Sequence, residues 1–145
     1  SSAASDVYKR QPGRSHMTDS KTNLIIDSKK DSKTMLKITC AALEDKKAFD
    51  IKIIDISKIS TLCDYIVIAD GTNKKQVQAL CDNVEDEMRE AGYNHKGVEG
   101  YSEGGWILLD YYDIIIHIFS EESRRFYNIE KIWNDGETVS LDSLD

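Results

Sequence analysis

The sequence predicts a mixed α/β domain, in which about five strands form one sheet and helices pack against it. Two observations predict this class. Segments with apolar residues at helical spacing alternate with short runs rich in β-branched residues, and turn residues separate them. In chain order the elements are helix, strand, strand, helix, three strands and a final helix. We expect the domain to cover residues 35–134.

The first helix is expected over residues 35–48. Its apolar side chains lie at helical spacing, at Leu36, Cys40 and Leu43. Thr34 precedes them, and a threonine hydroxyl in this position accepts a hydrogen bond from the first helical turn. We therefore expect the helix to begin at residue 35.

The 34 residues before this helix are expected to lie outside the domain. Residues 1–17 are polar and hold the only proline, which is typical of a translated adaptor or a cloning remnant. Met17 or Met35 would then be the natural start. Residues 18–34 form a polar, lysine-rich leader that is expected to be disordered.

Two strands and a helix are expected next. Residues 50–57 are rich in isoleucine, and residues 64–70 form an almost continuous apolar run, which is typical of a strand buried on both faces. Gly71 breaks the second strand, and Asn73 can cap the helix that follows. That helix has one apolar and one charged side and is expected to end at Gly92.

The sequence of the last third of the domain predicts a meander of three strands followed by a helix. The three strands are the runs "GVEGY", "WILLDY" and "DIIIHIF". Ser120 can cap the final helix, whose apolar stripe is expected to include Phe126 and Trp133. Residues 135–145 are acidic and are expected to form a flexible tail.

Charge limits the classes of partner. The whole chain has 19 Lys and Arg against 26 Asp and Glu, a net charge of −7. From Met35 onward the counts are 12 and 22, so this part carries −10. Such a domain repels naked nucleic acid and favours a basic partner, which its field would steer inward. Sequence-specific binding of nucleic acid is therefore not expected.

Composition also bears on location. No apolar run approaches the roughly 18 residues that a membrane span needs. The N-terminal segment has no secretory core, and its aspartates are unlike an organellar transit peptide. A cytoplasmic location is expected. The three widely spaced cysteines then favour reduced core thiols.

Catalytic and cofactor motifs are not found in the sequence. It has no Gly-x-Ser-x-Gly, no Walker A loop, no Gly-x-Gly-x-x-Gly and no Cys/His cluster with zinc spacing. We expect no catalytic residue, metal or cofactor. One alternative stays open: the helix start after Gly71, with Lys74 and Lys75, can hold an anion. Metal-dependent nucleotidyl transfer is disfavoured, because lysines stand where carboxylate ligands would be needed.

The stretch "EGYSEGGWILLDYYDIIIHIF" predicts a hairpin that turns at 110–113. That register places Trp106 opposite His117. One face is then purely aliphatic, and the other carries Trp106 and His117 with aspartates at its rim. Two explanations remain open. The second face lies under a helix, with His117 as an interior residue, or it is exposed and docks a partner.

Three blocks together resemble the ribosomal silencing factor (Iojap-like) family. They are "CDYIVIADGTNKKQVQAL", "EGYSEGGWILLDYYDIIIHIF" and "RRFYNIEKIW", and the resemblance covers Leu36–Trp133. The sequence departs from the family at three positions. Lys75 stands in place of a usual arginine, and Tyr112 and Asn134 stand in place of frequent glycines.

The resemblance implies a nucleotidyltransferase-like fold without transferase activity. It also implies binding to ribosomal protein fourteen of the large subunit, a steric block to joining of the small subunit, and a homodimer when free. A degenerate nucleotide-binding protein of the same fold is the alternative function. We expect residues of the hairpin to make the main contact with the ribosomal protein, and three further residues are secondary candidates. The hairpin residues are Trp106, Asp110, Tyr111, Asp113 and His117, and the further ones are Tyr65, Lys75 and Glu99.

Overall fold

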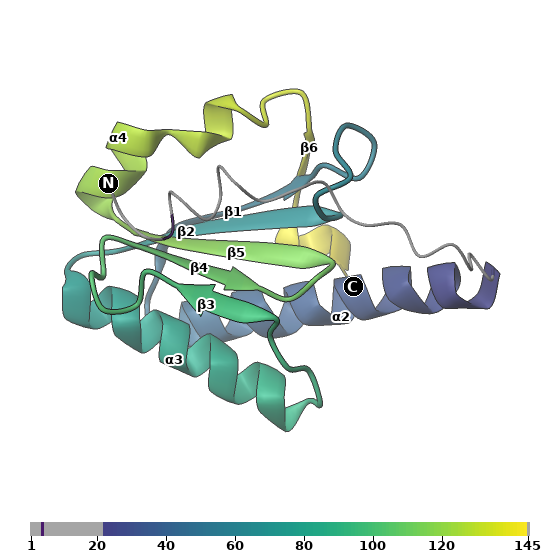
Figure 1. The fold of residues 1–145 in the computed structure, drawn as a ribbon, viewed down its shortest axis with the longest axis horizontal. Coiled ribbons are helices and arrows are strands. Elements are labelled where there is room, and N and C mark those ends of the chain that lie inside the picture. Colours follow the sequence, from purple (N-terminus) through teal and green to yellow (C-terminus); the bar gives the residue numbers. More distant parts are fainter. Residues whose placement is uncertain (1–3, 5–21, 145) are drawn as a thin grey trace.

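The molecule is built on one six-stranded sheet in the order β3-β4-β5-β2-β1-β6. The structure is a computed structural model that describes residue 4 and residues 22–144 (Figure 1). Neighbouring strands are antiparallel, except that β2 and β5 run parallel. The strands are β1 (Phe49–Asp55), β2 (Tyr65–Gly71), β3 (Gly97–Glu99), β4 (Trp106–Asp110), β5 (Ile114–Ser120) and β6 (Glu137–Val139).

Helices cover both faces of the sheet (Figure 1). On one face lie α2 (Thr22–Asp45) and α3 (Lys74–Glu90), and on the other lie α4 (Glu121–Tyr127) and the 3-10 helix η1 (Ile129–Lys131). A second 3-10 helix, η2 (Leu141–Leu144), packs against α2. The predicted α/β class is confirmed. Among the described residues, no helix combines the length and the apolar character that a membrane span requires.

Alternation of side chains along the central strands produces two apolar cores, one beneath each helical layer. The strands supply Ile53, Val67, Ala69, Ile107, Leu109, Ile114, Ile116 and Ile118 to the core under α2 and α3. They supply Ile54, Ile66, Ile68, Trp106, Leu108, Ile115 and Phe119 to the core under α4 and η1. Both faces are therefore buried, as the continuous apolar run of β2 predicts.

The parallel pair β2–β5 gives the sheet two chemically different ends. The strands pair in register from Tyr65 opposite Ile114 to Gly71 opposite Ser120. Each strand then passes directly into a capped helix, since Asn73 accepts a hydrogen bond from Gln76 N and Ser120 from Ser123 N. Both helices therefore begin at the same end of the sheet.

A buried arginine attaches α4 to this end of the sheet. Arg124 is 6% exposed, and its guanidinium donates to Asp70 Oδ1 on β2 and to Glu130 Oε1 on η1, both at 2.9 Å. Its Nη2 lies 3.3 Å from Asp50 Oδ2 on β1. The hydrogen bond from Arg124 lowers the pKa of Glu130, whereas burial raises the pKa of Asp70 against the effect of the arginine.

The first helix begins earlier than the sequence predicts. We expected it over 35–48 with Thr34 as its cap, but α2 spans Thr22–Asp45. No glycine or proline interrupts residues 22–34, and Tyr93 Oη donates to Asp31 Oδ1 at 3.2 Å, which anchors this segment to the domain. The helix therefore includes part of the segment that was expected to lie outside the domain. The expectations for residues 1–21 lie outside the described residues, apart from Ala4.

The end of the chain also differs from expectation. The final helix stops at Asn128, which adopts the left-handed conformation (φ 44°) and caps α4. Phe126 is consequently 80% exposed rather than part of a core. The expected flexible tail contains β6, which pairs with β1, and η2, whose Leu144 is buried in the first core. Backbone pairing with an open strand edge orders this acidic segment despite its composition.

The buried arginine yields a stability prediction. Arg124→Leu should lower the free energy of unfolding by about 3–5 kcal/mol, because it leaves Asp70 buried without its charge partner. Chemical denaturation followed by circular dichroism measures this loss. The exposed neighbour provides the control, since Arg125→Ala should change stability by less than about 0.5 kcal/mol. Adding Asp70→Asn should recover part of the loss, and strictly additive effects would contradict the assigned pairing.

Candidate partner-binding surface

The turn of the β4–β5 hairpin is centred one residue later in the chain than the sequence predicts. Trp106 pairs with Phe119 and Leu108 with His117, so the expected pairing of Trp106 with His117 is wrong by two residues. A shift of two residues leaves every side chain on its original face, because strand side chains alternate with a period of two. The predicted composition of the two faces is therefore confirmed, although the register is not.

The hairpin turn carries backbone strain at an exposed aromatic residue. Tyr112 has φ 70° and is 59% exposed. Asp113 N–H donates to Tyr111 O at 2.9 Å, and Asp110 Oδ1 accepts from Tyr112 N at 2.8 Å, so the chain reverses within three residues. A positive φ costs a residue with a Cβ roughly 1–2 kcal/mol.

The face with Trp106 and His117 lies under α4 and η1. Trp106 is 2% exposed and His117 is fully buried, so the structure favours the interior explanation over the exposed one. Trp106 Nε1 donates to His117 Nδ1 at 3.0 Å, and the Trp106 ring lies 4.6 Å from that of Tyr127 on α4. Burial lowers the pKa of His117 to about 3, so the ring is neutral at pH 7.

An acidic and aromatic rim forms at the other end of the sheet, where β2 and β5 begin. Asp113 O accepts from Asp64 N at 2.8 Å and from Tyr65 N at 3.2 Å, so the parallel pair brings these residues together. Burial raises the pKa of the Tyr65 phenol, and the nearby Asp55 and Asp64 raise it further. The "acidic rim" consists of Asp55, Asp64, Tyr65, Asp110, Tyr112 and Asp113.

The structure separates the expected contact residues into groups. Tyr65 and Asp113 lie half-buried in the acidic rim, whereas Asp110 is buried there at 8% exposure. Tyr111 lies directly beneath the rim, 2% exposed in the first core. The remaining expected residues are elsewhere: Trp106 and His117 are interior, Lys75 is exposed in the first turn of α3, and Glu99 is half-buried on the edge strand β3.

Sequence reasoning missed three members of the rim. Asp64 immediately precedes the buried strand β2, and Asp55 ends β1 opposite Tyr65. Tyr112 was noted only as a departure from a family pattern. Each is a polar or aromatic residue at the boundary of an apolar strand, and the pairing of β2 with β5 would have been needed to place them together.

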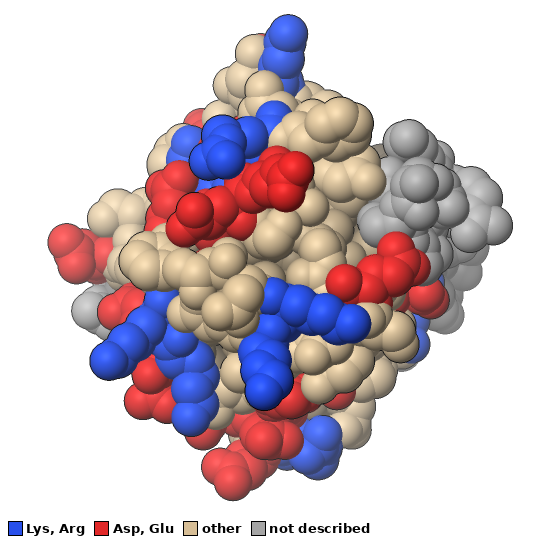
Figure 2. Space-filling view, turned by 90° about the vertical axis from the view of Figure 1, so that its left-hand side faces the viewer, with Lys and Arg blue, Asp and Glu red and all other residues tan. Residues whose placement is uncertain are grey.

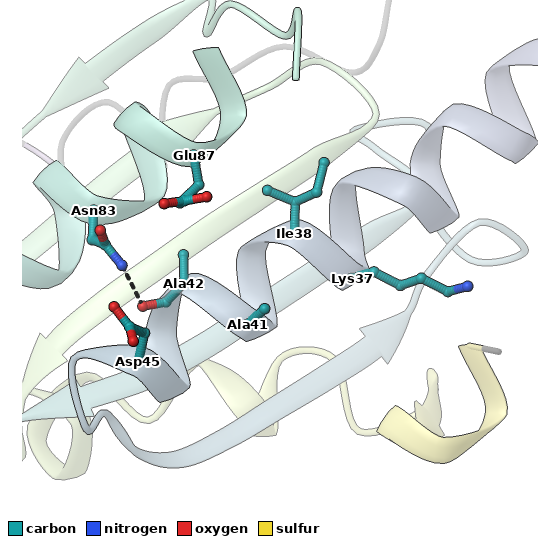
Figure 3. A pocket seen from close by; sticks show the side chains of 7 residues that line it. All are labelled: Lys37, Ile38, Ala41, Ala42, Asp45, Asn83 and Glu87. Carbon is teal, nitrogen blue, oxygen red and sulfur yellow. Dashed lines mark hydrogen bonds between the residues drawn. The ribbon is translucent and has the colours of Figure 1, made fainter. Parts of the chain in front are cut away.

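A groove lies between α2 and α3 (Figure 3). Its volume is about 480 Å³, and Asn83 Nδ2 donates to Ala42 O at 2.9 Å across it. The side chains that line it do not converge on one point, so it offers no constellation for catalysis. The lining residues are Lys37, Ile38, Ala41, Ala42, Asp45, Asn83 and Glu87.

One group in the described part of the chain has a ligand set for a metal ion, namely Cys81, Asp82 and Glu85. The Cys81 thiol donates to Glu85 Oε1 at 3.3 Å. Burial and the adjacent carboxylate raise the pKa of this thiol, whereas metal binding requires the thiolate. We therefore interpret Cys81 as a core thiol and Asp82 and Glu85 as surface residues of α3, rather than the three as a metal centre.

The chain is similar to known proteins over most of its length. Residues 29–145 match the family model described as "Ribosomal silencing factor during starvation". A ribosomal silencing factor from Bacillus subtilis is 41% identical over 110 residues, which cover 76% of this chain and 93% of that protein. Crystal structures from Chromobacterium violaceum and Bacillus halodurans have TM-scores of 0.69 and 0.67, at 36% and 34% identity. The matches cover 74% of this chain in both cases, and 88% and 97% of those chains.

The strained turn predicts a stabilising substitution. Tyr112→Gly should raise the free energy of unfolding by about 0.5–1 kcal/mol, because glycine adopts φ 70° without steric cost. Tyr112→Ala is the matched control, since alanine removes the ring but keeps the Cβ. Equal stabilities of the two variants in urea titrations would contradict the assigned strain.

The buried histidine predicts a pH dependence. The folded-state pKa of His117 lies below the unfolded value near 6.5, so the unfolded chain binds a proton that the folded chain does not. Above pH 6.5, protonation of His117 does not affect the free energy of unfolding. Below pH 6.5, the unfolded chain takes up this proton and the free energy of unfolding decreases by about 1.4 kcal/mol per pH unit. Unfolding free energies of the wild type should therefore fall more steeply between pH 6.5 and 4 than those of His117→Gln. Parallel curves would contradict the neutral buried ring.

Proposed function

The chain belongs to the family of ribosomal silencing factors that act during starvation, and from this premise we propose that it represses translation by binding the large ribosomal subunit. We further propose that the bound protein sterically prevents the small subunit from joining. The observation that carries this proposal is the acidic rim, where the half-buried Asp55, Asp64 and Asp113 lie with the exposed Tyr112 at one end of the sheet. Its chemistry suits a basic partner.

The proposed direct partner is ribosomal protein fourteen of the large subunit. From Met35 onward the chain carries −10, and long-range attraction of that size steers a basic surface toward the domain. The aspartates of the rim then fix orientation. Tyr112, which is 59% exposed, supplies the kind of aromatic anchor that holds many interfaces together.

The proposed mechanism requires occupancy alone. A protein interface of standard size covers about 800 Å² of each partner, roughly a tenth of the 8343 Å² surface of this chain. The rest of the domain then projects from the large subunit and occupies the space that the small subunit needs. No covalent step and no cofactor enters this scheme, which takes place in the cytoplasm.

Two further parts of the proposal concern the free protein. We propose that it forms a homodimer when no ribosome is present. The alternative, a nucleotide-binding protein that uses the helix start after Gly71, is less well supported. Thr72 N donates to Gln76 Oε1 and Gln76 N donates to Asn73 Oδ1, so the chain's own side chains already occupy this helix start.

Charge reversal in the rim tests the proposal. Asp113→Lys should weaken binding to purified large subunits at least tenfold, which is about 1.4 kcal/mol, and should restore subunit joining measured by light scattering. Tyr112→Ala should weaken binding through loss of the anchor. Glu90→Lys changes the charge equally on the exposed face of α3 and should bind normally. Normal subunit joining in the presence of saturating wild-type protein would overturn the proposal.

A further inference from the structure

Four lysines gather at the end of the sheet opposite the acidic rim. Lys46 and Lys47 lie in the turn between α2 and β1, and Lys74 and Lys75 begin α3. All four are exposed. Figure 2 shows this end of the molecule, where Lys and Arg side chains (blue) in the lower half of the view are interspersed with Asp and Glu side chains (red). We name these four residues the "lysine cluster".

Hydrogen bonds hold the two halves of the cluster side by side. The Gln76 side chain on α3 donates from Nε2 to Lys46 O at 3.2 Å and to Lys47 O at 3.1 Å. Lys74 packs closely on Gly104, where a Cβ would lie 2.4 Å from Lys74 Cγ. The backbone of the cluster is therefore fixed, although the ammonium groups extend into solvent.

The cluster is positive within an otherwise acidic domain. In the part of the chain that the structure describes, none of the four ammonium groups lies within ion-pair distance of a carboxylate. The first turn of α3 contains no acidic residue, although that position favours carboxylates. The helix dipole of α3 adds to the positive potential here. The charge of the cluster is thus available to an external anion.

We propose that the lysine cluster binds the phosphate backbone of RNA. The inference rests on the proposed function, because the large subunit presents RNA beside its proteins. Lysine ammonium groups suit phosphates as flexible point charges. The cluster is not built around a buried aromatic pocket of the kind that anchors protein interfaces, so RNA is favoured over an acidic protein. Backbone contacts carry no sequence information, so the cluster would bind RNA without regard to its sequence.

The two ends of the sheet would then act together. The acidic rim contacts a basic protein, the lysine cluster contacts RNA, and the remaining acidic surface is repelled by RNA. This arrangement determines which way the molecule faces on the subunit. The phosphate contacts of the lysine cluster would also add to the salt dependence of binding to the large subunit, beyond the part that the acidic rim contributes.

The experiment compares Lys74→Glu/Lys75→Glu with Lys33→Glu/Lys131→Glu, which changes the charge equally at exposed lysines outside both the cluster and the acidic rim. Lys74→Gln/Lys75→Gln serves as a milder variant. Fluorescence anisotropy measures binding to purified large subunits between 50 and 300 mM KCl, and to a short labelled RNA hairpin at 50 mM KCl. Loss of two phosphate contacts should reduce the log–log salt slope by about 1.5 and weaken hairpin binding at least fivefold.

The outcomes separate this inference from the proposed function. Equal slopes and equal hairpin affinities for the cluster and control variants overturn the RNA contact, even if subunit binding persists. Weaker subunit binding with an unchanged slope and no hairpin binding also overturns it, since the occupant is then an acidic protein. Hairpin binding through the cluster without any subunit binding supports the RNA contact and overturns the proposed function. If the wild type binds neither, both fail.

Discussion

The parallel pairing of β2 with β5 is the constraint on which the rest of the structure depends. Because both strands run in the same direction, both begin at one end of the sheet and both lead into helices at the other. The acidic rim forms where they begin, with Asp64 and Tyr65 bonded to Asp113 O. The lysine cluster lies where β2 leads into α3. A single backbone arrangement thus places the acidic rim at one end of the domain and the lysine cluster, beside several carboxylates, at the other.

Packing on both faces makes this arrangement rigid. A one-residue slip of a central strand would move its side chains from one core into the other, where they would no longer fit the packing around them. On the second face, the packing of Trp106 on Tyr127 and the hydrogen bonds of Arg124 to Asp70 and Glu130 hold α4 and η1 against the sheet. Aromatic and charged residues that look like surface features in the sequence therefore support the site from within. The binding chemistry proposed here belongs to the strand ends and turns that this core holds in place.

The sequence predicts the class, most element positions and the facing of the hairpin, because these depend on local periodicity and capping. Asn73 and Ser120 cap their helices as expected. The break at Asn128 is harder to predict, since an asparagine in the left-handed conformation resembles any polar helix residue in sequence. The parallel pairing that assembles the acidic rim is a tertiary property. Asp110 and Asp113 flank one hairpin turn in the sequence and were predicted as contact residues. Asp64 reaches the rim only through the parallel pairing, and neither it nor Tyr112 was predicted.

A cryo-EM reconstruction of this protein on the large subunit would test the central claim most directly. The account predicts that the acidic rim faces a basic ribosomal protein, that the lysine cluster faces RNA, and that the domain occupies the surface where the small subunit joins. A map in which the rim lies in solvent, or in which the domain lies away from the joining surface, would contradict it.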